Sequence, residues 1–401
     1  MSSRPLAGVR VVECASIIAG PYCSYLLTLL GAETIKIERP LRGDWMRSQG
    51  GDAALAAAGM GSMFLSCNAG KRSVALDLKD PRGVKIAREI AAQADVMIEN
   101  WRPGTAARLG VGYEDIRRVN PKIVYCSISG FGQDGPMSPR AAYDHIIQAV
   151  AGIMSITGTP ETAPSRTGPP LVDYLTALSA TVGILAALRE RDRTGEPQFV
   201  DVGMLDCAVA AMGSVVSAHV NGGIPAMPIG NAAASGAAAS GLFQTSTSKL
   251  TLVANTEEQY AALCRTLNRP DLLTDPRFQA PATRKQNQDA LRAIIEACLK
   301  ARPAIEWEQT LAAAGVPAGA VRSVPELLHE EQVAARGLFR QLAVPEVDRT
   351  AMFPAAGLKL NGISIGPTRG PPALGADNDS VLAELGYDHS QRRALRQDGV
   401  W

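Results

Sequence analysis

The sequence predicts an α/β protein, with a mainly parallel sheet in a large domain and a second, smaller α+β domain. Short β-branched segments alternate with helical segments between Val9 and Ser129, which is the pattern of βαβ units. A Gly- and Ala-rich stretch begins near Asn221 and separates this region from further helical segments. The chain has 401 residues, 46% hydrophobic and 20% charged, so it has room for two or three domains with buried cores.

The first domain is expected to contain strands at 9–15, 32–40, 72–80, 95–104 and 122–129. The helices between them are expected at 20–31, 81–94 and 105–121. Ligands of such sheets bind outside the carboxyl ends of the strands. We therefore expect the ligand site at Ala15–Pro21, Glu38–Pro40, Glu99–Gly104 and Ser129–Gly135.

The pattern changes after Tyr143. Two long apolar helices are expected, at 143–158 and in "GPPLVDYLTALSATVGILAALRERDRTG" from Gly168, followed by a strand at 197–205 and a helix at 206–220. Beyond a loop, a hairpin is expected at 242–255 and helices at 256–268, 282–300 and 303–315. The predicted domains are 1–220, 221–330 with a mobile loop at 222–241, and 331–401, a linker and helix that return to the large domain.

Charge and cysteine content exclude several classes of protein. Lys and Arg number 40 and Asp and Glu 39, so we expect neither a nucleic-acid partner nor a polybasic membrane contact. No uniformly apolar stretch of about 20 residues and no secretion signal are evident, so no membrane-spanning helix is expected. Seven scattered cysteines without a CxxC pair, and four distant histidines, predict no metal site and suit a cytoplasmic protein with reduced thiols.

One glycine motif needs separate treatment. The segment "GFGQDG" at 130–135 follows a predicted strand and matches GxGxxG, the dinucleotide fingerprint. That fingerprint requires a helix to begin there, but Pro136 and Pro139 prevent one. We interpret the motif as a glycine-rich loop at a strand end.

Several cations occur near the predicted strand ends: Lys36, Arg39, Arg72, Lys79, Arg102, Arg108 and Arg140. Any one of them alone is best explained as a solvated surface charge. Their recurrence on one edge of a sheet favours a ligand that carries phosphate groups, since Arg and Lys both bind phosphate.

Asp173 stands at the start of the long apolar helix. It could be an N-cap, whose carboxylate accepts a backbone N–H of the first turn. It could also be a nucleophile, kept ionised because a helix N-terminus lowers the pKa of a carboxylate. The two roles are compatible, and composition alone does not choose between them.

A set of longer segments resembles a known family. "PLAGVRVVECASIIAGPYCSYLLTLLGAETIKIERP", "NAGKRSVALDLKDPRG", "ADVMIENWRPG", "YCSISGFGQDGP", the Gly168 segment with "EPQFVDVGMLD", and "PPALGADNDSVLAELG" occur in this order over nearly the whole chain. Each is weak alone, but together they resemble the family III CoA-transferases, the family of formyl-CoA transferase and carnitine CoA-transferase.

The resemblance implies a Rossmann-like large domain, a small domain, and two chains interlocked as a homodimer. It implies a reaction that moves coenzyme A from an acyl-CoA to a free carboxylic acid, with coenzyme A as a substrate and no tightly bound cofactor. The family's catalytic aspartate corresponds to Asp173, which would form an acyl anhydride and then a thioester with coenzyme A. Which donor and which acceptor acid are used is not indicated.

The same resemblance implies which residues bind coenzyme A: Ile18, Ala19, Arg39, Leu76, Lys79, Asn100, Trp101, Arg102, Arg108, Arg140, Tyr143 and Asp144. Many relatives have Gln where Ile18 stands, so one hydrogen bond to the ligand is absent here. A glycine-rich lid in formyl-CoA transferase corresponds to 230–241, so Gly230 and Asn231 are expected in a substrate loop.

Two alternatives remain at this stage. A 2-methylacyl-CoA racemase of the same fold needs a base on each face of the α-carbon, and its His would stand at Tyr143, whereas the chain has His145. A non-catalytic protein that binds coenzyme A would keep the basic edge of the sheet and tolerate loss of Asp173.

Overall fold

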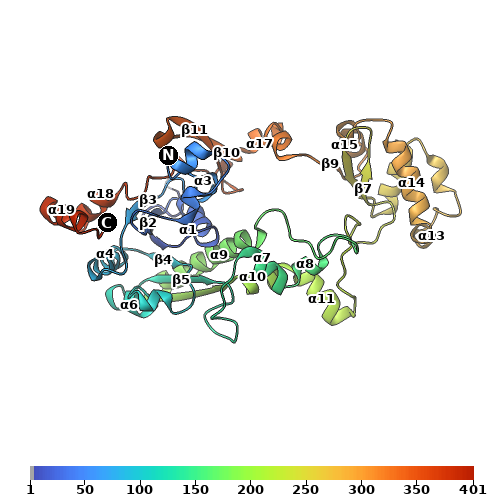
Figure 1. Cartoon of the computed structure of the whole chain (residues 1–401). Helices are drawn as coiled ribbons and strands as arrows, with labels where there is room; N and C mark the ends of the chain where they lie inside the picture. The colour runs from blue at the N-terminus through green and yellow to red at the C-terminus, as the bar shows by residue number, and fades with distance from the viewer. Residues whose placement is uncertain (1–3) are drawn as a thin grey trace. The chain divides into compact units, whose positions relative to one another are not determined.

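A computed structural model describes residues 4–401 (Figure 1). The chain divides into two compact units. One comprises residues up to Ile153, Thr167–Ile224 and Glu331–Trp401, and the other comprises Met154–Arg166 and Pro225–Glu330.

The first unit is built around a six-stranded sheet. Its order is β3-β2-β1-β4-β5-β6, and every neighbouring pair is parallel. The strands are β1 (Arg10–Cys14), β2 (Glu33–Glu38), β3 (Arg72–Ala75), β4 (Val96–Glu99), β5 (Val124–Ser129) and β6 (Gln198–Gly203). This confirms the predicted α/β class and parallel sheet. The order reverses between β1 and β4, which is the point where doubly wound sheets bind their ligands.

Helices cover both faces of this sheet. The helices of the first unit are α1 (Ala19–Leu29), α2 (Ala53–Ala57), α3 (Ser62–Asn68), α4 (Pro81–Ala92), α5 (Thr105–Arg108), α6 (Tyr113–Val119), α7 (Asp144–Val150), α9 (Leu171–Thr194), α10 (Met204–Ala211), α11 (Gly213–Gly222), α17 (Glu331–Arg336), α18 (Asn378–Glu384) and α19 (His389–Gln397). On β1, Val11 packs in a core with α1 and α9, whereas Val12 packs in a core with α4, α6, α18 and α19. Because successive strand residues face opposite sides, a strand buried on both faces reads as a continuous apolar run.

Several predicted helices are broken in two. The helix expected at 143–158 is interrupted at Gly152 (φ +88°), between α7 and α8 (Ile153–Ile156). The helix expected at 105–121 is split into α5 and α6, with Gly110 at φ +74° between them. Glycine adopts this left-handed conformation without the steric cost that other residues meet, so each break falls where the sequence allows it.

The C-terminal region returns to the sheet, where α18 lies beside β3 and α19 lies next to α18 (Figure 1). Asp377 accepts the N–H of Ser73 at 2.8 Å, and the Arg72 guanidinium lies 2.7 Å from Glu384. The same region forms a hairpin that the sequence did not suggest, made of β10 (Phe339–Val344) and β11 (Arg349–Pro354), together with the short pair β12 (Lys359–Leu360) and β13 (Ile363–Ser364).

The second unit combines a small antiparallel sheet with helices. The sheet contains β7 (Gly241–Gln244), β8 (Lys249–Leu252) and β9 (Ala318–Ala320), and the first two form the predicted hairpin. Its helices are α12 (Glu257–Thr266), α13 (Pro281–Gln286), α14 (Gln288–Leu299), α15 (Ala304–Ala313) and α16 (Val324–Leu328). Residues 224–240 contain neither helix nor strand.

The long apolar helix predicted from Gly168 is α9. Helix α9 is long and apolar enough to cross a membrane, with a mean hydropathy of 1.8 over its best window. In the structure its buried side chains Ala180, Ile184 and Leu188 pack in the core beneath β4, β5 and β6. Its hydropathy is therefore that of a core helix that covers one face of the sheet.

Candidate active site

The carboxyl ends of β1 and β4 are joined by one side chain. Asn100, just after β4, accepts the N–H of Ser16 at 2.9 Å and donates its amide to the Ser16 carbonyl at 2.7 Å. Both backbone groups of Ser16 are thus held by a residue of the neighbouring strand end. The segment between β1 and α1 is fixed at the point where the strand order reverses, which is where a ligand is expected.

Two neighbouring cavities open at this edge of the sheet and share Ser16 and Trp101. The smaller, of about 280 Å³, is lined by predicted residues from several strand ends: Ile18, Ala19, Asn100, Trp101, Arg102, Arg140, Tyr143 and Asp173. The larger, of about 620 Å³, is lined among others by Arg39, Leu76, Lys79, Trp101 and Arg108. Every predicted coenzyme A residue except Asp144 lies at one of these cavities. The contacts with coenzyme A themselves stay predictions.

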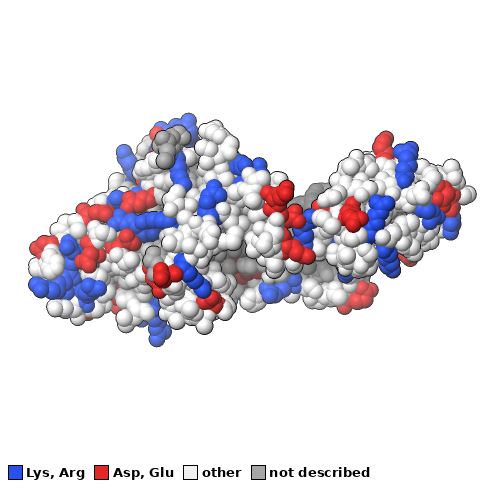
Figure 2. Space-filling model, turned by 90° about the horizontal axis from the view of Figure 1, so that it is seen from above, with Lys and Arg blue, Asp and Glu red and all other residues white. Residues whose placement is uncertain are grey.

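Five of the seven strand-end cations line the cavities: Arg39, Lys79, Arg102, Arg108 and Arg140. The other two do not, and their assignment to the ligand edge was wrong. Lys36 points into the interior, where its ammonium lies 2.5 Å from Glu13, and Arg72 pairs with Glu33 and Glu384. Elsewhere on the surface seen in Figure 2, basic and acidic side chains are interspersed and form no extended field of one sign.

Asp173 is the third residue of α9 and is partly buried. It does not cap the helix, because another carboxylate does. Asp144, at the start of α7, accepts the N–H of Val172 at 2.8 Å and that of Asp173 at 3.2 Å. The N-cap interpretation of Asp173 is therefore wrong, and its carboxylate is left available at the wall of the smaller cavity.

The pKa of Asp173 is raised to about 7, first because burial disfavours the charged form and second because the Asp144 carboxylate is close. The sequence had predicted a lowered pKa from the helix N-terminus. The helix N-terminus does not lower the pKa of Asp173 as predicted, because the nearest N–H groups of the first turn donate to Asp144 instead. A carboxylate with a pKa near 7 is a stronger base and nucleophile than an ordinary one, and it is still about half ionised at neutral pH.

Asp144 itself has a role that the sequence did not indicate. Its carboxylate is 7% exposed and also accepts the amide of Gln148 at 2.5 Å. A direct contact with coenzyme A stays a prediction, but in the structure Oδ2 holds the start of α9 while Oδ1 accepts from Gln148 on α7. Asp144 is the first residue of α7, and no local signal in the sequence pairs it with the start of α9.

Glu99 is a further functional candidate that sequence reasoning missed. It ends β4, is 4% exposed, and accepts the N–H of Trp101 at 2.8 Å. Burial raises its pKa to about 7, although hydrogen bonds from Ser127 and Trp101 act in the opposite direction. It lies directly before Asn100, so it helps to fix the turn that forms one wall of both cavities.

The substrate loop lies in the second unit. Gly230 donates its N–H to Gly158 at 2.7 Å, and Asn231 lines a cavity of about 370 Å³ within that unit. These residues belong to the second unit and Asp173 to the first, and their role over the aspartate stays a prediction. Among the predicted rivals, the racemase lacks support, because Tyr143 lines the smaller cavity and His145 does not.

These features define an α/β protein with a basic cavity at its strand ends beside a partly buried carboxylate. The sequence model of the protein family "CoA-transferase family III" matches residues 6–378, and the chain belongs to this family.

The chain is 36% identical over 400 residues to the succinyl-CoA:glutarate CoA-transferase of Mus musculus, covering 100% of this chain and 91% of the relative. It is 38% identical over 338 residues to the acetyl-CoA:oxalate CoA-transferase of Acetobacter aceti, covering 83% and 85%. A CAIB/BAIF family protein from Brucella suis has a solved structure with a TM-score of 0.86 at 30% identity, covering 96% of this chain and all of that one. The protein is thus a CoA-transferase that acts between acyl-CoA thioesters and carboxylates.

Proposed function

We propose that the protein transfers coenzyme A from succinyl-CoA to a short dicarboxylic acid, with Asp173 as the covalent nucleophile. One observation carries the mechanism. The carboxylate of Asp173 is partly buried, is not used to cap its own helix, and lies in a cavity that adjoins a basic cavity. The substrates are suggested by the relatives, several of which act on succinyl-CoA with glutarate, D-citramalate or mesaconate.

The reaction proceeds through four acyl exchanges. The Asp173 carboxylate attacks the thioester carbonyl of the donor, the C–S bond breaks, and coenzyme A leaves as a thiolate, which gives an aspartyl–acyl anhydride. The thiolate then attacks the aspartyl carbonyl, releases the donor as a free carboxylate, and forms an aspartyl–CoA thioester. The acceptor carboxylate attacks this thioester and expels the thiolate, which finally attacks the acceptor's acyl carbon and regenerates the Asp173 carboxylate.

The raised pKa of Asp173 suits this sequence of steps. The overall reaction replaces one coenzyme A thioester with another of similar energy, so the exchange needs no external energy source. A nucleophile of higher basicity attacks the thioester faster than an ordinary carboxylate does. Since only the ionised form attacks, the rate is expected to rise with pH through about 7.

The decisive variant is Asp173→Ala, with Asp192→Ala as a matched change on the exposed far end of the same helix. We expect Asp173→Ala to reduce CoA exchange between succinyl-CoA and labelled glutarate by at least about 10³-fold, because the covalent route is removed. Coenzyme A should still bind to both variants. Undiminished exchange in Asp173→Ala would exclude the mechanism.

A trapping experiment tests the intermediates directly. Hydroxylamine added during turnover should convert the activated Asp173 into a hydroxamate, found by mass spectrometry in the peptide that contains it. A panel of acyl-CoA donors and mono- and dicarboxylic acceptors then tests the substrate class. Preference for a monocarboxylate such as formate would reject the dicarboxylate part of the proposal and leave the nucleophile intact.

We further propose that two copies of the chain form a homodimer. Apolar side chains of the first unit are exposed on three successive helices, with Val182 on α9 67% exposed, Val209 on α10 43% and Val220 on α11 72%. Exposed apolar side chains on successive helices favour a surface that another chain covers. Sedimentation should give twice the mass of 42.2 kDa, and Val182→Asp should shift the protein toward monomer.

A further inference from the structure

The segment that leads from β1 into α1 contains a strained residue. Ile17 has φ +72°, in the left-handed region. This conformation is a genuine outlier for a β-branched residue, and it is energetically unfavourable. Such a conformation persists only where surrounding contacts enforce it.

The contact that enforces it comes from Asp44. Its Oδ1 atom accepts the N–H of Ile17 at 3.2 Å and the N–H of Met46 at 3.0 Å. The preceding residue, Ser16, is held on both backbone groups by Asn100. The chain is therefore fixed immediately before Ile17 by one side chain and at Ile17 by another.

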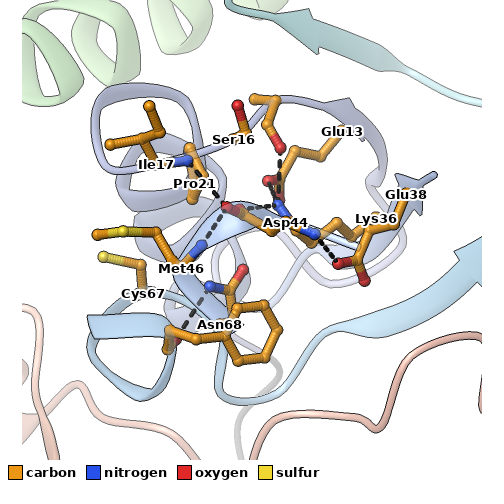
Figure 3. A network of polar contacts seen from close by, with 12 residues as sticks. Glu13, Ser16, Ile17, Pro21, Lys36, Glu38, Asp44, Met46, Cys67 and Asn68 are labelled. Atoms are coloured by element: carbon orange, nitrogen blue, oxygen red, sulfur yellow. Dashed lines mark hydrogen bonds and ion pairs between the residues drawn. The ribbon is translucent and has the colours of Figure 1, made fainter. Parts of the chain in front are cut away.

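Asp44 is in turn fixed by a fully buried ammonium group (Figure 3). Lys36 Nζ lies 3.0 Å from Asp44 Oδ2, donates to the Ala15 carbonyl at 2.7 Å, and lies 2.5 Å from Glu13. Lys36 thus binds both the Ala15 carbonyl at the end of β1 and the Asp44 carboxylate that accepts the N–H of Ile17.

The network continues on its far side. Lys71 donates to Glu13 at 2.7 Å, to the Pro21 carbonyl at 2.8 Å and to Asn68 at 2.9 Å. Since Pro21 belongs to the first turn of α1, buried ammonium groups hold the chain both before and after the strained residue. The lysines and Glu13 are at most 1% exposed, so solvent does not compete for these contacts.

We propose that Asp44 is a positioning residue of the active site, which holds Ile17 in its left-handed conformation and thereby places Ile18 and Ala19 against Asp173. Those two residues line the smaller cavity together with Asp173. Asp44 also borders the larger cavity, but its side chain is fully buried and its carboxylate contacts Ile17, Met46 and Lys36, so we place its action on Ile17. The proposal rests on the proposed function, because it presumes that the chemistry occurs at Asp173.

A double-variant experiment separates this role from general stabilisation. We expect Asp44→Ala to lower kcat by about 10²-fold, as a shift on the order of 1 Å in an active-site wall can do. The Kd of coenzyme A, measured by calorimetry, should change by less than about threefold, since the basic cavity keeps its cations. Ile17→Gly, added to Asp44→Ala, should restore kcat by about tenfold, because glycine adopts φ near +72° without strain.

The matched control is Asp388→Ala. Asp388 is also a capping aspartate, which accepts the N–H of Gln391 at 2.9 Å at the start of α19. Its loss should leave kcat within about twofold of the parent, as expected for a surface cap. If the double variant gains nothing over Asp44→Ala, or if folded Asp44→Ala keeps the parent kcat, the proposal is rejected.

Hydrogen exchange provides a second measurement that needs no catalysis. The amides of 15–20 should exchange faster in Asp44→Ala, while those of β4 and β5 stay protected. If that variant does not fold, Asp44→Leu replaces it, since Leu has a similar volume and no hydrogen-bond acceptor. Unchanged exchange over 15–20 would reject the proposal. Failure of the proposed function is seen separately, as full activity in Asp173→Ala.

Discussion

Two regions of the first unit bury carboxylates in opposite ways. In the network behind the active site, Glu13 lies between two buried lysines. Burial alone would raise its pKa, but Lys36 and Lys71 outweigh that effect and lower it to about 2. At the cavity, no cation lowers the pKa of Asp173. Burial and the nearby carboxylate of Asp144 raise it to about 7.

The difference shows how one kind of side chain serves two purposes. A buried carboxylate that is paired with ammonium groups stays ionised over the whole physiological range and can act as a fixed anchor. A buried carboxylate without such a partner titrates near neutrality and keeps the reactivity of a stronger base. Glu99, whose pKa is also raised to about 7 by burial, belongs with Asp173 in this respect.

The largest effect is expected from breaking the paired region with Lys36→Met. Removing the ammonium leaves Glu13 and Asp44 buried with one cation fewer, which should cost about 3–5 kcal/mol in the free energy of unfolding. Urea unfolding followed by tryptophan fluorescence measures this difference.

The control is Lys85→Met, which removes an exposed lysine 3.5 Å from Glu89. An exposed pair of this kind contributes little to stability, because water screens it. Equal stability of the two variants would mean that the buried network does not anchor the fold.

A smaller effect on stability is expected from Glu99→Gln, which tests a buried carboxylate that has no ammonium partner. Because the folded pKa is raised to about 7, the folded state binds a proton that the unfolded state has lost, and stability falls as pH rises from about 4.5 to 7. Gln stays neutral and can still accept the N–H of Trp101. The variant should match the parent at pH 4.5 and exceed it at pH 8 by up to about 3 kcal/mol.

Thermal unfolding at the two pH values measures this change, with the exposed Glu114→Gln as control. The control should alter stability equally at both pH values. A Glu99→Gln variant that loses stability at pH 8 would show that Glu99 is ionised and favourably paired in the folded state.

The smallest effect is expected from Asp144→Asn, which removes the like charge beside Asp173 but can keep an acceptor for Val172. Burial is the larger cause and still raises the pKa of Asp173, so the pKa should fall only partway toward that of an ordinary aspartate. The acid limb of kcat/KM, expected near pH 7 in the parent, should move down by the same amount.

Asp52→Asn is the control, since Asp52 accepts the N–H of Leu55 at the start of α2 and is not among the groups that shift Asp173. Its acid limb should not move. An unmoved limb in Asp144→Asn would mean that burial alone sets the pKa of Asp173.

Much of the fold could be predicted because its signals are local. The alternation of strands and helices gave the parallel sheet, and the turns after β1, β2, β4 and β5 were placed where ligand-binding edges occur. The broken helices were missed because a single glycine inside an apolar run does not reveal whether the chain will bend there. The hairpin of β10 and β11 was missed because its residues have no clear two-residue alternation.

By itself the sequence determined the sheet, the basic strand ends and the place of Asp173 at the head of an apolar helix. Only the tertiary structure decided that Asp144 caps that helix, that Lys36 turns inward to Glu13, and that Asp44 holds Ile17. A carboxylate or an ammonium has the same chemistry wherever it stands in the chain. Its charge state and its role depend on burial and on partners 23 to 29 residues away, such as Glu13 for Lys36 and Asp144 for Asp173, which only folding brings together.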